Sequence, residues 1–273
     1  MSRVLRSGRG PAAWYAHQMS IDVSALRRHY RTHGFVTGVP VVPPEEAARL
    51  LSRIGSIEEA EETARGGAWP ERNVLPGTDP LHPIEAVLQP LVRDPRVLAP
   101  VRALLGDSVL LRNCDIFIKS AASTVEIGWH TDTGRIGRGT DGMLSLWLAL
   151  TPATRGNGAL EFVSGSHIHA TPPPSRDKSM LSLSPERVAR IDSARVVCST
   201  MPAGCASLHH FGLSHRSGPN GTDARRVAVV MRFMAPWVSR WSAECGRATL
   251  VCGEDGFGKY ELEERFPVAW TVR

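Results

Sequence analysis

Apolar residues recur at helical spacing in the first third of the chain and give way to short alternating runs after Gly106. A spacing of three to four residues predicts amphipathic helices, because such residues fall on one face of a helix. Prolines and glycines mark several of their bounds. Four helices are predicted, at residues 22–33, 43–54, 84–92 and 96–105. Residues 56–82 carry charges, glycines and prolines and are predicted to form a loop.

The part after Gly106 consists of short runs rich in β-branched and apolar residues. Their length and spacing are typical of a double-sheet jelly roll. In the run 143–150 the leucines fall on one face, and Ser145, Trp147 and Ala149 fall on the other. We therefore expect one face to pack in a core and the other to line a cavity. Six strands are predicted, at residues 109–119, 143–150, 160–163, 194–199, 205–209 and 226–233.

These two patterns predict one domain over residues 21–273, mainly β with α. Its parts are a helical portion over about 21–106, a jelly-roll core over about 107–235 and a C-terminal extension over 236–273. The extension has no assigned role. Residues 1–20 are rich in Arg, Gly, Ser and Pro and are predicted to be a flexible basic tail.

Composition narrows the possible functions. Hydrophobic residues make up 42% and charged residues 22% of the 273 positions, which fits a globular protein with a sizeable core. The net charge of +5 comes from scattered Lys and Arg, so nucleic acid is not an expected partner. Five cysteines without a CxxC pair predict neither a disulfide framework nor a zinc ribbon. With no apolar leader and no long apolar run, neither export nor a membrane is expected, and the predicted location is cytoplasmic.

The segment GWHTD, residues 128–132, contains the first candidate metal ligands. In an extended strand, residues two apart point to the same side, so His130 and Asp132 can bind one ion together. An HxD tripeptide alone is common by chance, but His215 offers a third ligand. Two imidazoles and one carboxylate on one face of an octahedral ion leave three positions open, as Fe(II) oxygenases require. The HExxH motif of zinc peptidases is absent from the sequence.

The chain contains, in this order, the segments YRTHGFVTGVPVVPPEEAARL, IFIKSAASTVEIGWHTD, LWLALTPATRGNGALEFVSGSH and AGCASLHHFGLSHRSGPNGTDARRVAVVMRF. In these segments, from about Leu26 to Phe233, it resembles the phytanoyl-CoA dioxygenase family of Fe(II)/2-oxoglutarate oxygenases. The resemblance implies a double-stranded β-helix, that is, a jelly roll buttressed by N-terminal helices. It implies Fe(II), 2-oxoglutarate and O₂ as cofactor and co-substrates. It also implies that His130 and Asp132 are the proximal metal ligands and His215 the distal one.

The resemblance further assigns groups that bind 2-oxoglutarate. Arg226, eleven residues after His215, corresponds to the arginine that receives its remote carboxylate, and a guanidinium fork suits that role. Arg225 is the rival, because strand alternation lets only one of the two face inward. Ser217 corresponds to a hydroxyl donor that joins Arg226. Four further residues correspond to positions that line the 2-oxoglutarate or substrate pocket: Asn113, Lys119, Thr131 and Trp147.

Two residues of the HTD tripeptide set this chain apart from some relatives. Thr131 stands where the commoner His-Gln-Asp has glutamine, which removes an amide from that position. Asp132 distinguishes the chain from halogenating relatives, which carry a small residue in place of the carboxylate. Halogenation is therefore disfavoured.

Other polar residues have two interpretations each. His167 suits the fixing of a loop at least as well as catalysis. His209 and His210 are alternatives to His215 as a ligand, but only His215 is in register with the downstream family residues. Asp115 shares a strand face with Asn113 and can contact substrate or form a structural ion pair. The proline-rich stretch 165–188 is long enough for a lid, although an ordinary surface loop explains it equally well.

The predicted function is that of a Fe(II)/2-oxoglutarate-dependent dioxygenase that hydroxylates a small metabolite in a bacterial specialised-metabolite pathway. Desaturation, epimerisation and oxidative cyclisation use the same cofactors and stay open as alternatives. A non-catalytic jelly-roll binding module would more naturally have lost one of the four key residues, and a cupin-like isomerase would not need all three ligands. A small, polar or moderately polar molecule is the expected partner. The oligomeric state stays open.

Overall fold

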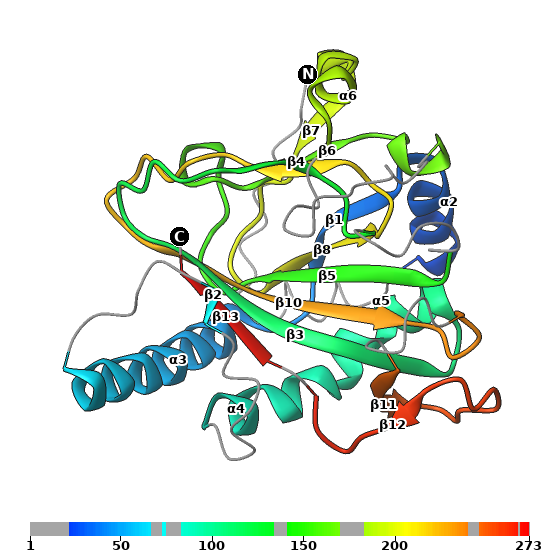
Figure 1. Cartoon of the computed structure of the whole chain (residues 1–273), viewed down its shortest axis with the longest axis horizontal. Coiled ribbons are helices and arrows are strands. Elements are labelled where there is room, and N and C mark those ends of the chain that lie inside the picture. Colours follow the sequence, from blue (N-terminus) through cyan, green and yellow to red (C-terminus); the bar gives the residue numbers. More distant parts are fainter. Residues whose placement is uncertain are drawn as a thin grey trace, which may run out of the picture.

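The computed structural model describes residues 22–66, 73–74, 83–133, 141–169, 183–239, 246–266 and 268–272. Within them, two β-sheets face each other, and helices cover the outer side of the larger sheet (Figure 1). The predicted fold class, a jelly roll that is mainly β with α, is confirmed. None of the helices in these ranges is both long and apolar enough to cross a membrane.

The helices of the first third begin and end largely as the sequence predicts. The first, α2 (Val23–His33), is capped by the Asp22 carboxylate, which accepts a hydrogen bond from the Ala25 amide at 2.9 Å, and it ends at Gly34 with φ of 83°. The others in this part are α3 (Pro44–Arg65), α4 (Pro83–Val92) and α5 (Pro95–Leu105). A short helix, α6 (Pro185–Ala189), occurs later in the chain. Single 3₁₀ turns occur at Arg155–Asn157, Ser166–His169 and Ser193–Arg195.

The predicted loop at residues 56–82 was wrong over its first part, because α3 continues to Arg65. This part reads SIEEAEETAR, and Glu and Ala are strong helix formers. Its charged residues therefore form a solvated helical extension instead of a loop. Residues 67–72 and 75–82 of that prediction lie outside the described ranges.

The larger sheet has nine strands within the described residues. Along its main path the strands are β1 (Phe35–Pro40), β8 (Cys205–His210), β5 (Met143–Ala149), β10 (Arg226–Met234), β3 (Val109–Lys119), β11 (Arg247–Cys252) and β12 (Glu261–Leu262). Beside this path, β13 (Val268–Val272) pairs with both β3 and β2 (Asn73–Val74). The C-terminal extension thus supplies β11, β12 and β13, which the sequence analysis did not predict.

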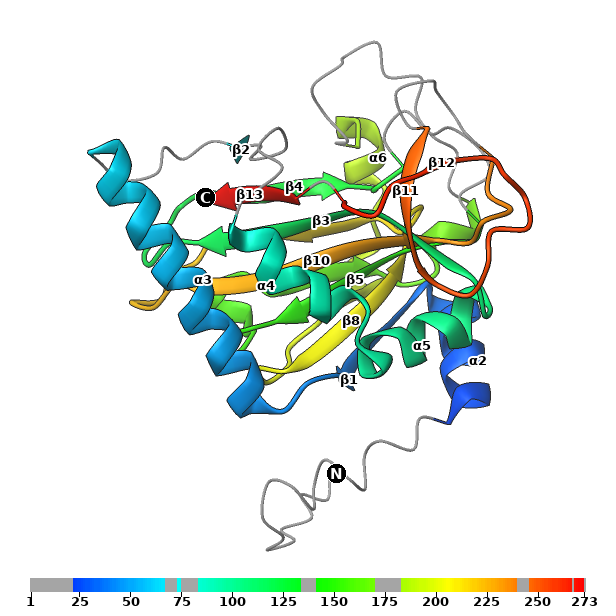
Figure 2. The same cartoon turned by 90° about the horizontal axis from the view of Figure 1, so that it is seen from below.

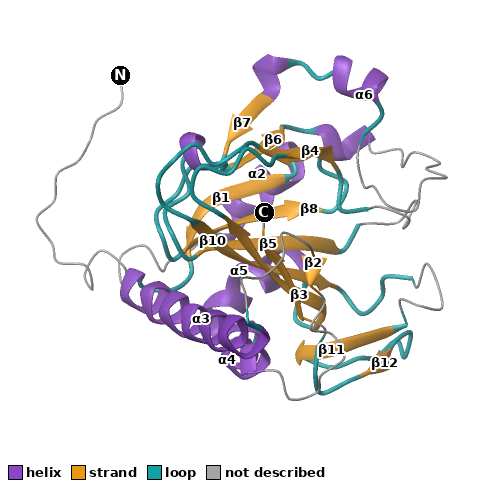
Figure 3. Cartoon of the chain, turned by 60° about the vertical axis from the view of Figure 1, so that its left-hand side comes forward, coloured by secondary structure: helices purple, strands orange, loops and turns teal. Residues whose placement is uncertain are grey.

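The smaller sheet lies over the other face of the larger one (Figure 3). Its strands, in spatial order, are β4 (Ile127–His130), β9 (His215–Ser217), β6 (Leu160–Val163) and β7 (Val196–Cys198). The predicted strand 194–199 is shorter than expected, because a 3₁₀ turn occupies residues 193–195.

Alternation along β5 separates the two faces of the larger sheet. Leu144, Leu146 and Leu148 are fully buried in the core shared with α3, α4 and α5, which lie across this face in Figure 2. Trp147 and Ala149 belong to a second apolar cluster, between the two sheets. The predicted division of this strand into a packing face and an inner face is confirmed. The space between the sheets is where the candidate site lies.

Candidate active site

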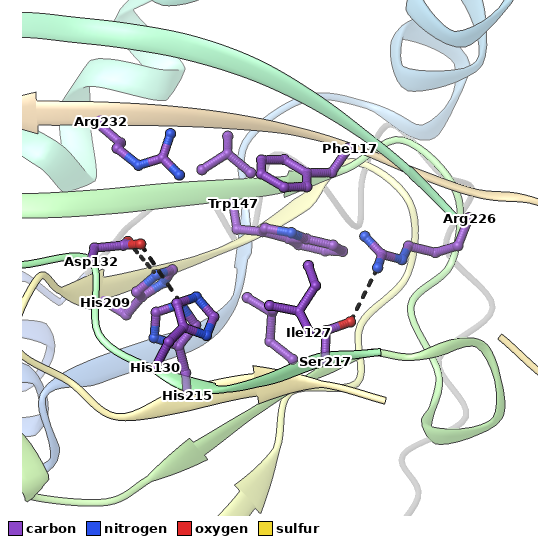
Figure 4. Close-up of a pocket in the computed structure, with 12 residues that line it drawn as sticks. Phe117, Ile127, His130, Asp132, Trp147, His209, His215, Ser217, Arg226 and Arg232 are labelled. Atoms are coloured by element: carbon purple, nitrogen blue, oxygen red, sulfur yellow. Dashed lines mark hydrogen bonds and ion pairs between the residues drawn. The ribbon is translucent and has the colours of Figure 1, made fainter. Parts of the chain in front are cut away.

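Two histidines lie opposite each other in the smaller sheet. β4 and β9 are antiparallel and pair His130 with His215, whose ring centroids are 4.0 Å apart. Asp132 follows His130 by two residues, in the turn after the end of β4. The ligand atoms of the three side chains all lie within 4.8 Å of one another. This set could hold one metal ion (Figure 4).

Backbone carbonyls fix the two imidazoles in the same tautomer. Nδ1 of His130 lies 2.8 Å from the Gly128 oxygen, and Nδ1 of His215 lies 2.9 Å from the Leu213 oxygen. A carbonyl oxygen only accepts, so Nδ1 carries the proton and donates in both rings. Each Nε2 therefore keeps its lone pair for a metal.

The carboxylate of Asp132 has one oxygen held by the protein and one available. Ser145 Oγ donates to Oδ2 at 2.5 Å, and Nε2 of His209 lies 3.4 Å from the same oxygen. The other oxygen, Oδ1, lies 4.0 Å from Nε2 of His215. This geometry orients Oδ1 toward the histidines and assigns Ser145 and His209 to the support of the carboxylate.

Burial and neighbouring charges set the protonation of the three groups. Burial lowers the pKa of His130 to about 3, with a further contribution from His215, and it lowers the pKa of His215 to about 4. Burial alone would raise the pKa of Asp132, but Arg232 and then His209 bring that pKa well below its ordinary value. At neutral pH the set therefore offers two neutral nitrogens and one carboxylate, which suits Fe(II).

A charged arginine without an anionic partner lies at one end of the site. Arg226 is 2% exposed, and its Nη2 donates to Ser217 Oγ at 3.3 Å and to the Gly158 carbonyl at 3.4 Å. Its Nε has no hydrogen-bond partner, and its guanidinium carbon lies 5.2 Å from the centroid of the Trp147 ring. Burial lowers its pKa to about 10, so it stays charged at neutral pH. No carboxylate in the described part of the chain pairs with it.

The neighbouring Arg225 points the other way. Its Nη1 donates to Oε2 of Glu58 on α3 at 2.6 Å, and its side chain is 41% exposed. Because side chains alternate along a strand, Arg226 points to the inner face and Arg225 points to the surface. This is the orientation that the sequence analysis preferred.

A pocket of about 430 Å³ runs between the sheets from Arg226, past the histidines, to Arg232. Figure 4 shows the two arginines at opposite ends, with the Trp147 ring between them. The pocket is lined by Phe117, Ile127, His130, Asp132, Trp147, Leu160, His209, His215, Ser217, Arg226, Val230 and Arg232.

Lys119, which the resemblance assigns to the pocket, is not part of its lining. Its ammonium donates to the carbonyls of Val125 and Ser217, each at 3.1 Å, and to the carbonyl of Gly218. All of these acceptors are backbone atoms near the ends of β4 and β9. The structure therefore gives this buried lysine a role in holding the backbone beside the site.

Asn113 and Thr131 also lie outside the pocket lining. Thr131 Oγ1 is hydrogen-bonded to Thr133 Oγ1 at 2.6 Å, within the turn that follows β4. Asn113 Nδ2 donates to Asp115 Oδ1 at 2.8 Å. Both side chains thus act on neighbouring polar groups, and not on the pocket.

His167 has a structural environment. Its Nε2 lies 3.1 Å from the backbone oxygen of Arg31, so it ties the turn after β6 to α2. This matches the loop-fixing interpretation. Most of the expected lid, residues 170–182, lies outside the described residues.

His209 was considered from the sequence only as an alternative metal ligand, and Arg232 was given no role. Both inner-face positions could have been found by counting in steps of two along a strand. Arg232 follows Arg226 by six residues on β10, and His209 follows Cys205 by four on β8. Even spacing places each on the inner face.

Comparison with known proteins agrees with this geometry. The family model of phytanoyl-CoA dioxygenase (PhyH) matches residues 30–228, which is most of the chain. The chain belongs to this family. Phytanoyl-CoA dioxygenase-family oxygenases use Fe(II), 2-oxoglutarate and O₂, and the three-residue cluster described above is of the kind that such an enzyme needs.

Individual relatives lie within the same family. The chain is 25% identical to a probable alpha-ketoglutarate-dependent hypophosphite dioxygenase of Stutzerimonas stutzeri, over 86% of this chain and 83% of that protein. It is 28% identical to the ectoine dioxygenase of Streptomyces coelicolor, over 78% and 76%. The structure of the non-heme monooxygenase ThoJ superposes with a TM-score of 0.72 and 29% identity, over 88% of each chain. The epimerase SnoN, at a TM-score of 0.64 and 20% identity, shares the fold.

Proposed function

We propose that this family member hydroxylates a small metabolite, with Fe(II) held by His130, Asp132 and His215 and with 2-oxoglutarate held by Arg226. The observation that carries the proposal is Arg226 itself, a buried cation with no partner for its Nε and no carboxylate partner among the described residues, facing the same pocket as the three ligand side chains. A buried charge is costly unless it is paired. A dicarboxylate that also reaches the metal would supply the missing anion.

The residues present fit both groups. Nε2 of His130, Oδ1 of Asp132 and Nε2 of His215 would hold the iron, and the Arg226 guanidinium with the Ser217 hydroxyl would bind the remote carboxylate of 2-oxoglutarate. When bound, iron and 2-oxoglutarate supply the activation of O₂ and the oxidation of the substrate.

The protein itself contributes orientation and the exclusion of water. Ser145 and His209 hold Oδ2 of Asp132, so that Oδ1 faces the metal. Trp147 packs beside Arg226 and lies between Arg226 and Arg232 (Figure 4). Apolar side chains such as Phe117 and Ile127 line the space between Arg226 and the histidines and would exclude water from bound 2-oxoglutarate.

Hydroxylation is proposed because of the activities named for the more similar relatives. Two relatives at 25% and 28% identity are named as dioxygenases, and the solved relative at 29% identity is titled a monooxygenase. Epimerisation and carbocyclisation appear in the titles of SnoN and SnoK, whose 20% identity carries only the fold. Hydroxylation is therefore the proposed reaction, with epimerisation and cyclisation as outcomes that the test can reveal.

The test is aerobic turnover of the Fe(II)-loaded protein with 2-oxoglutarate and a library of small metabolites. We expect succinate to form in a substrate-dependent manner, together with a product heavier by one oxygen atom. A product lighter by two hydrogens, or an isomer of the substrate, would replace hydroxylation by cyclisation, desaturation or epimerisation. Equal turnover by a His215→Ala variant would contradict the proposed metal site.

A further inference from the structure

A polar row crosses the inner face of the larger sheet beside Asp132. Strand pairing places four residues side by side on β3, β10, β5 and β8, in the order Asn113, Arg232, Ser145 and His209. The last two hold the carboxylate of Asp132. The first two make no hydrogen bond with it. This half of the row is therefore available for another role.

Arg232 reaches the pocket at the end opposite to Arg226. The two arginines lie six residues apart on β10, about 20 Å along an extended strand. A five-carbon diacid that is held by Arg226 and chelates the metal cannot also fill the space near Arg232. The Arg232 end of the pocket is left for a second molecule.

Arg232 is fixed in position and still has N–H groups to offer. Its Nη1 donates to Asp115 Oδ2, while Asn113 Nδ2 donates to the other oxygen of that carboxylate at 2.8 Å. Its Nε and Nη2 donate to no residue of the described ranges, and the side chain, which lines the pocket, is 15% exposed. An oxygen atom of a ligand can accept these hydrogen bonds.

The surrounding charges select the kind of ligand. Asp115 offsets the charge of Arg232, whereas Arg226 has no such partner in the part of the chain that the structure describes. Once Fe(II) and the 2-oxoglutarate dianion are bound, the two positive charges of the iron cancel those of the dianion. The negative charge of Asp132 and the positive charge of Arg226 also cancel, so the bound groups and these two residues are neutral together. An anionic substrate would then be buried without a counter-charge, which is costly. A neutral oxygen acceptor carries no such cost.

We propose that Arg232, oriented by Asp115, is the group that binds the primary substrate, and that this substrate is an uncharged molecule with a carbonyl or hydroxyl oxygen on an apolar body. The oxygen accepts from Arg232, and the body lies against Val230, two residues before Arg232 on β10, and Trp147 on β5, which pairs with Val230. This inference rests on the proposed function, since it assigns to 2-oxoglutarate the other end of the pocket.

The experiment uses protein loaded with 2-oxoglutarate and Zn(II), a diamagnetic and redox-inert substitute for Fe(II), and saturation-transfer NMR with three probes of similar size. The probes are δ-valerolactam, a neutral carbonyl compound; cyclohexanecarboxylate, an anion; and piperidine, a cation at neutral pH. We expect the lactam to give the strongest signal with the wild-type protein. We expect that signal to fall at least fivefold in the Arg232→Met/Asp115→Asn double variant, which removes both charges together and so avoids an unpaired buried charge.

A single Asp115→Asn variant tests the charge argument separately. It leaves Arg232 without its counter-charge, so the carboxylate probe should gain at least fivefold relative to the lactam. Arg225→Ala serves as the surface control and should leave all three signals unchanged.

Lactam binding that is absent, no stronger than that of piperidine, or unaffected in the double variant would overturn the inference. Titration of 2-oxoglutarate into each protein separates this result from the proposed function. Failure of the wild-type protein to bind 2-oxoglutarate would contradict the function itself, whereas normal binding with no dependence of the lactam on Arg232 would contradict only the substrate site.

Discussion

The two arginines on the inner face of β10 are prepared for different ligands. Arg226 is almost fully buried, has an unpaired Nε and meets no carboxylate in the described part of the chain. Arg232 is paired with Asp115 and keeps part of its side chain in the pocket. In the proposed assignment, the arginine at one end of the pocket binds an anion and the arginine at the other end donates hydrogen bonds to a neutral ligand. The partners that the protein supplies, and not the residue type, distinguish the two.

The largest expected effect is on the stability of the metal-free protein. Substitution of the two arginines should change the free energy of unfolding in opposite directions. Arg232→Met leaves the Asp115 carboxylate buried without its cation, so the free energy of unfolding should fall by about 3 kcal/mol. Arg226→Met removes a charge that burial disfavours, so the free energy of unfolding should rise by about 1–2 kcal/mol. Urea unfolding at pH 7 measures both.

The pKa of Arg226 gives the pH range of this second effect. Burial lowers that pKa from its ordinary value to about 10 in the folded protein. Below pH 10 both the folded and the unfolded states carry the proton, so the cost of burying the charge is fully present. Above pH 10 the folded state releases the proton first, and the cost declines. A change of the same sign in both variants at pH 7 would break the comparison.

The next effect is on co-substrate affinity. Arg226→Ala should weaken 2-oxoglutarate binding by a factor of about 30 or more, because a charge-assisted contact with a carboxylate contributes roughly 2 kcal/mol or more. The Arg232→Met/Asp115→Asn double variant should change that affinity by less than about threefold, since this end of the pocket does not hold the diacid. Anaerobic calorimetry with Fe(II) present gives both constants. A larger loss in the double variant would reverse the assignment of the two ends.

A smaller effect concerns the support of Asp132. Ser145→Ala removes the hydrogen bond to Oδ2 and should weaken Fe(II) binding about tenfold. The matched control is Ser207→Ala on the neighbouring strand, a buried serine whose Oγ has no hydrogen-bond partner. Competition with a chelator of known affinity measures both. Equal affinities in the two variants would show that Ser145 does not orient the metal ligand.

The smallest effect is expected at Arg225. Its pair with Glu58 is largely solvent-exposed on the arginine side, so Arg225→Ala should lower the free energy of unfolding by less than about 1 kcal/mol. Binding of 2-oxoglutarate should be unchanged. A loss of co-substrate affinity comparable to that of Arg226→Ala would mean that the strand register is wrong.

Much of the fold could be predicted because its signals are local. The alternation of leucines with Ser145 and Trp147 gave the two faces of β5, and Asp22 and Gly34 gave the bounds of α2. The extension of α3 to Arg65 was missed because its charges were given more weight than its helix propensity. The strands β11 and β13 of the C-terminal extension were missed because they are stabilised by pairing with β3, a contact distant in sequence.

In the candidate site, too, some positions could be predicted from local sequence and others could not. The spacing of His130 and Asp132 is local, and the inward direction of Arg226 followed from alternation. The support of Asp132 by Ser145 and His209, in contrast, depends on which strands are neighbours. The assignment of Lys119 to the pocket ignored three backbone carbonyls that the fold brings to its ammonium. Such pairings across strands are not visible in a single sequence.

The central claim is that His130, Asp132 and His215 hold iron in a form that chelates 2-oxoglutarate. The most direct measurement is an anaerobic titration of the Fe(II)-loaded protein with 2-oxoglutarate, followed by the visible charge-transfer absorption of the Fe(II) chelate. We predict saturable absorption at one iron per chain in the wild-type protein and in His210→Asn, a buried histidine outside the pocket lining, and none in His215→Ala. Absence of the absorption from the wild-type protein, or its persistence in His215→Ala, would contradict the claim.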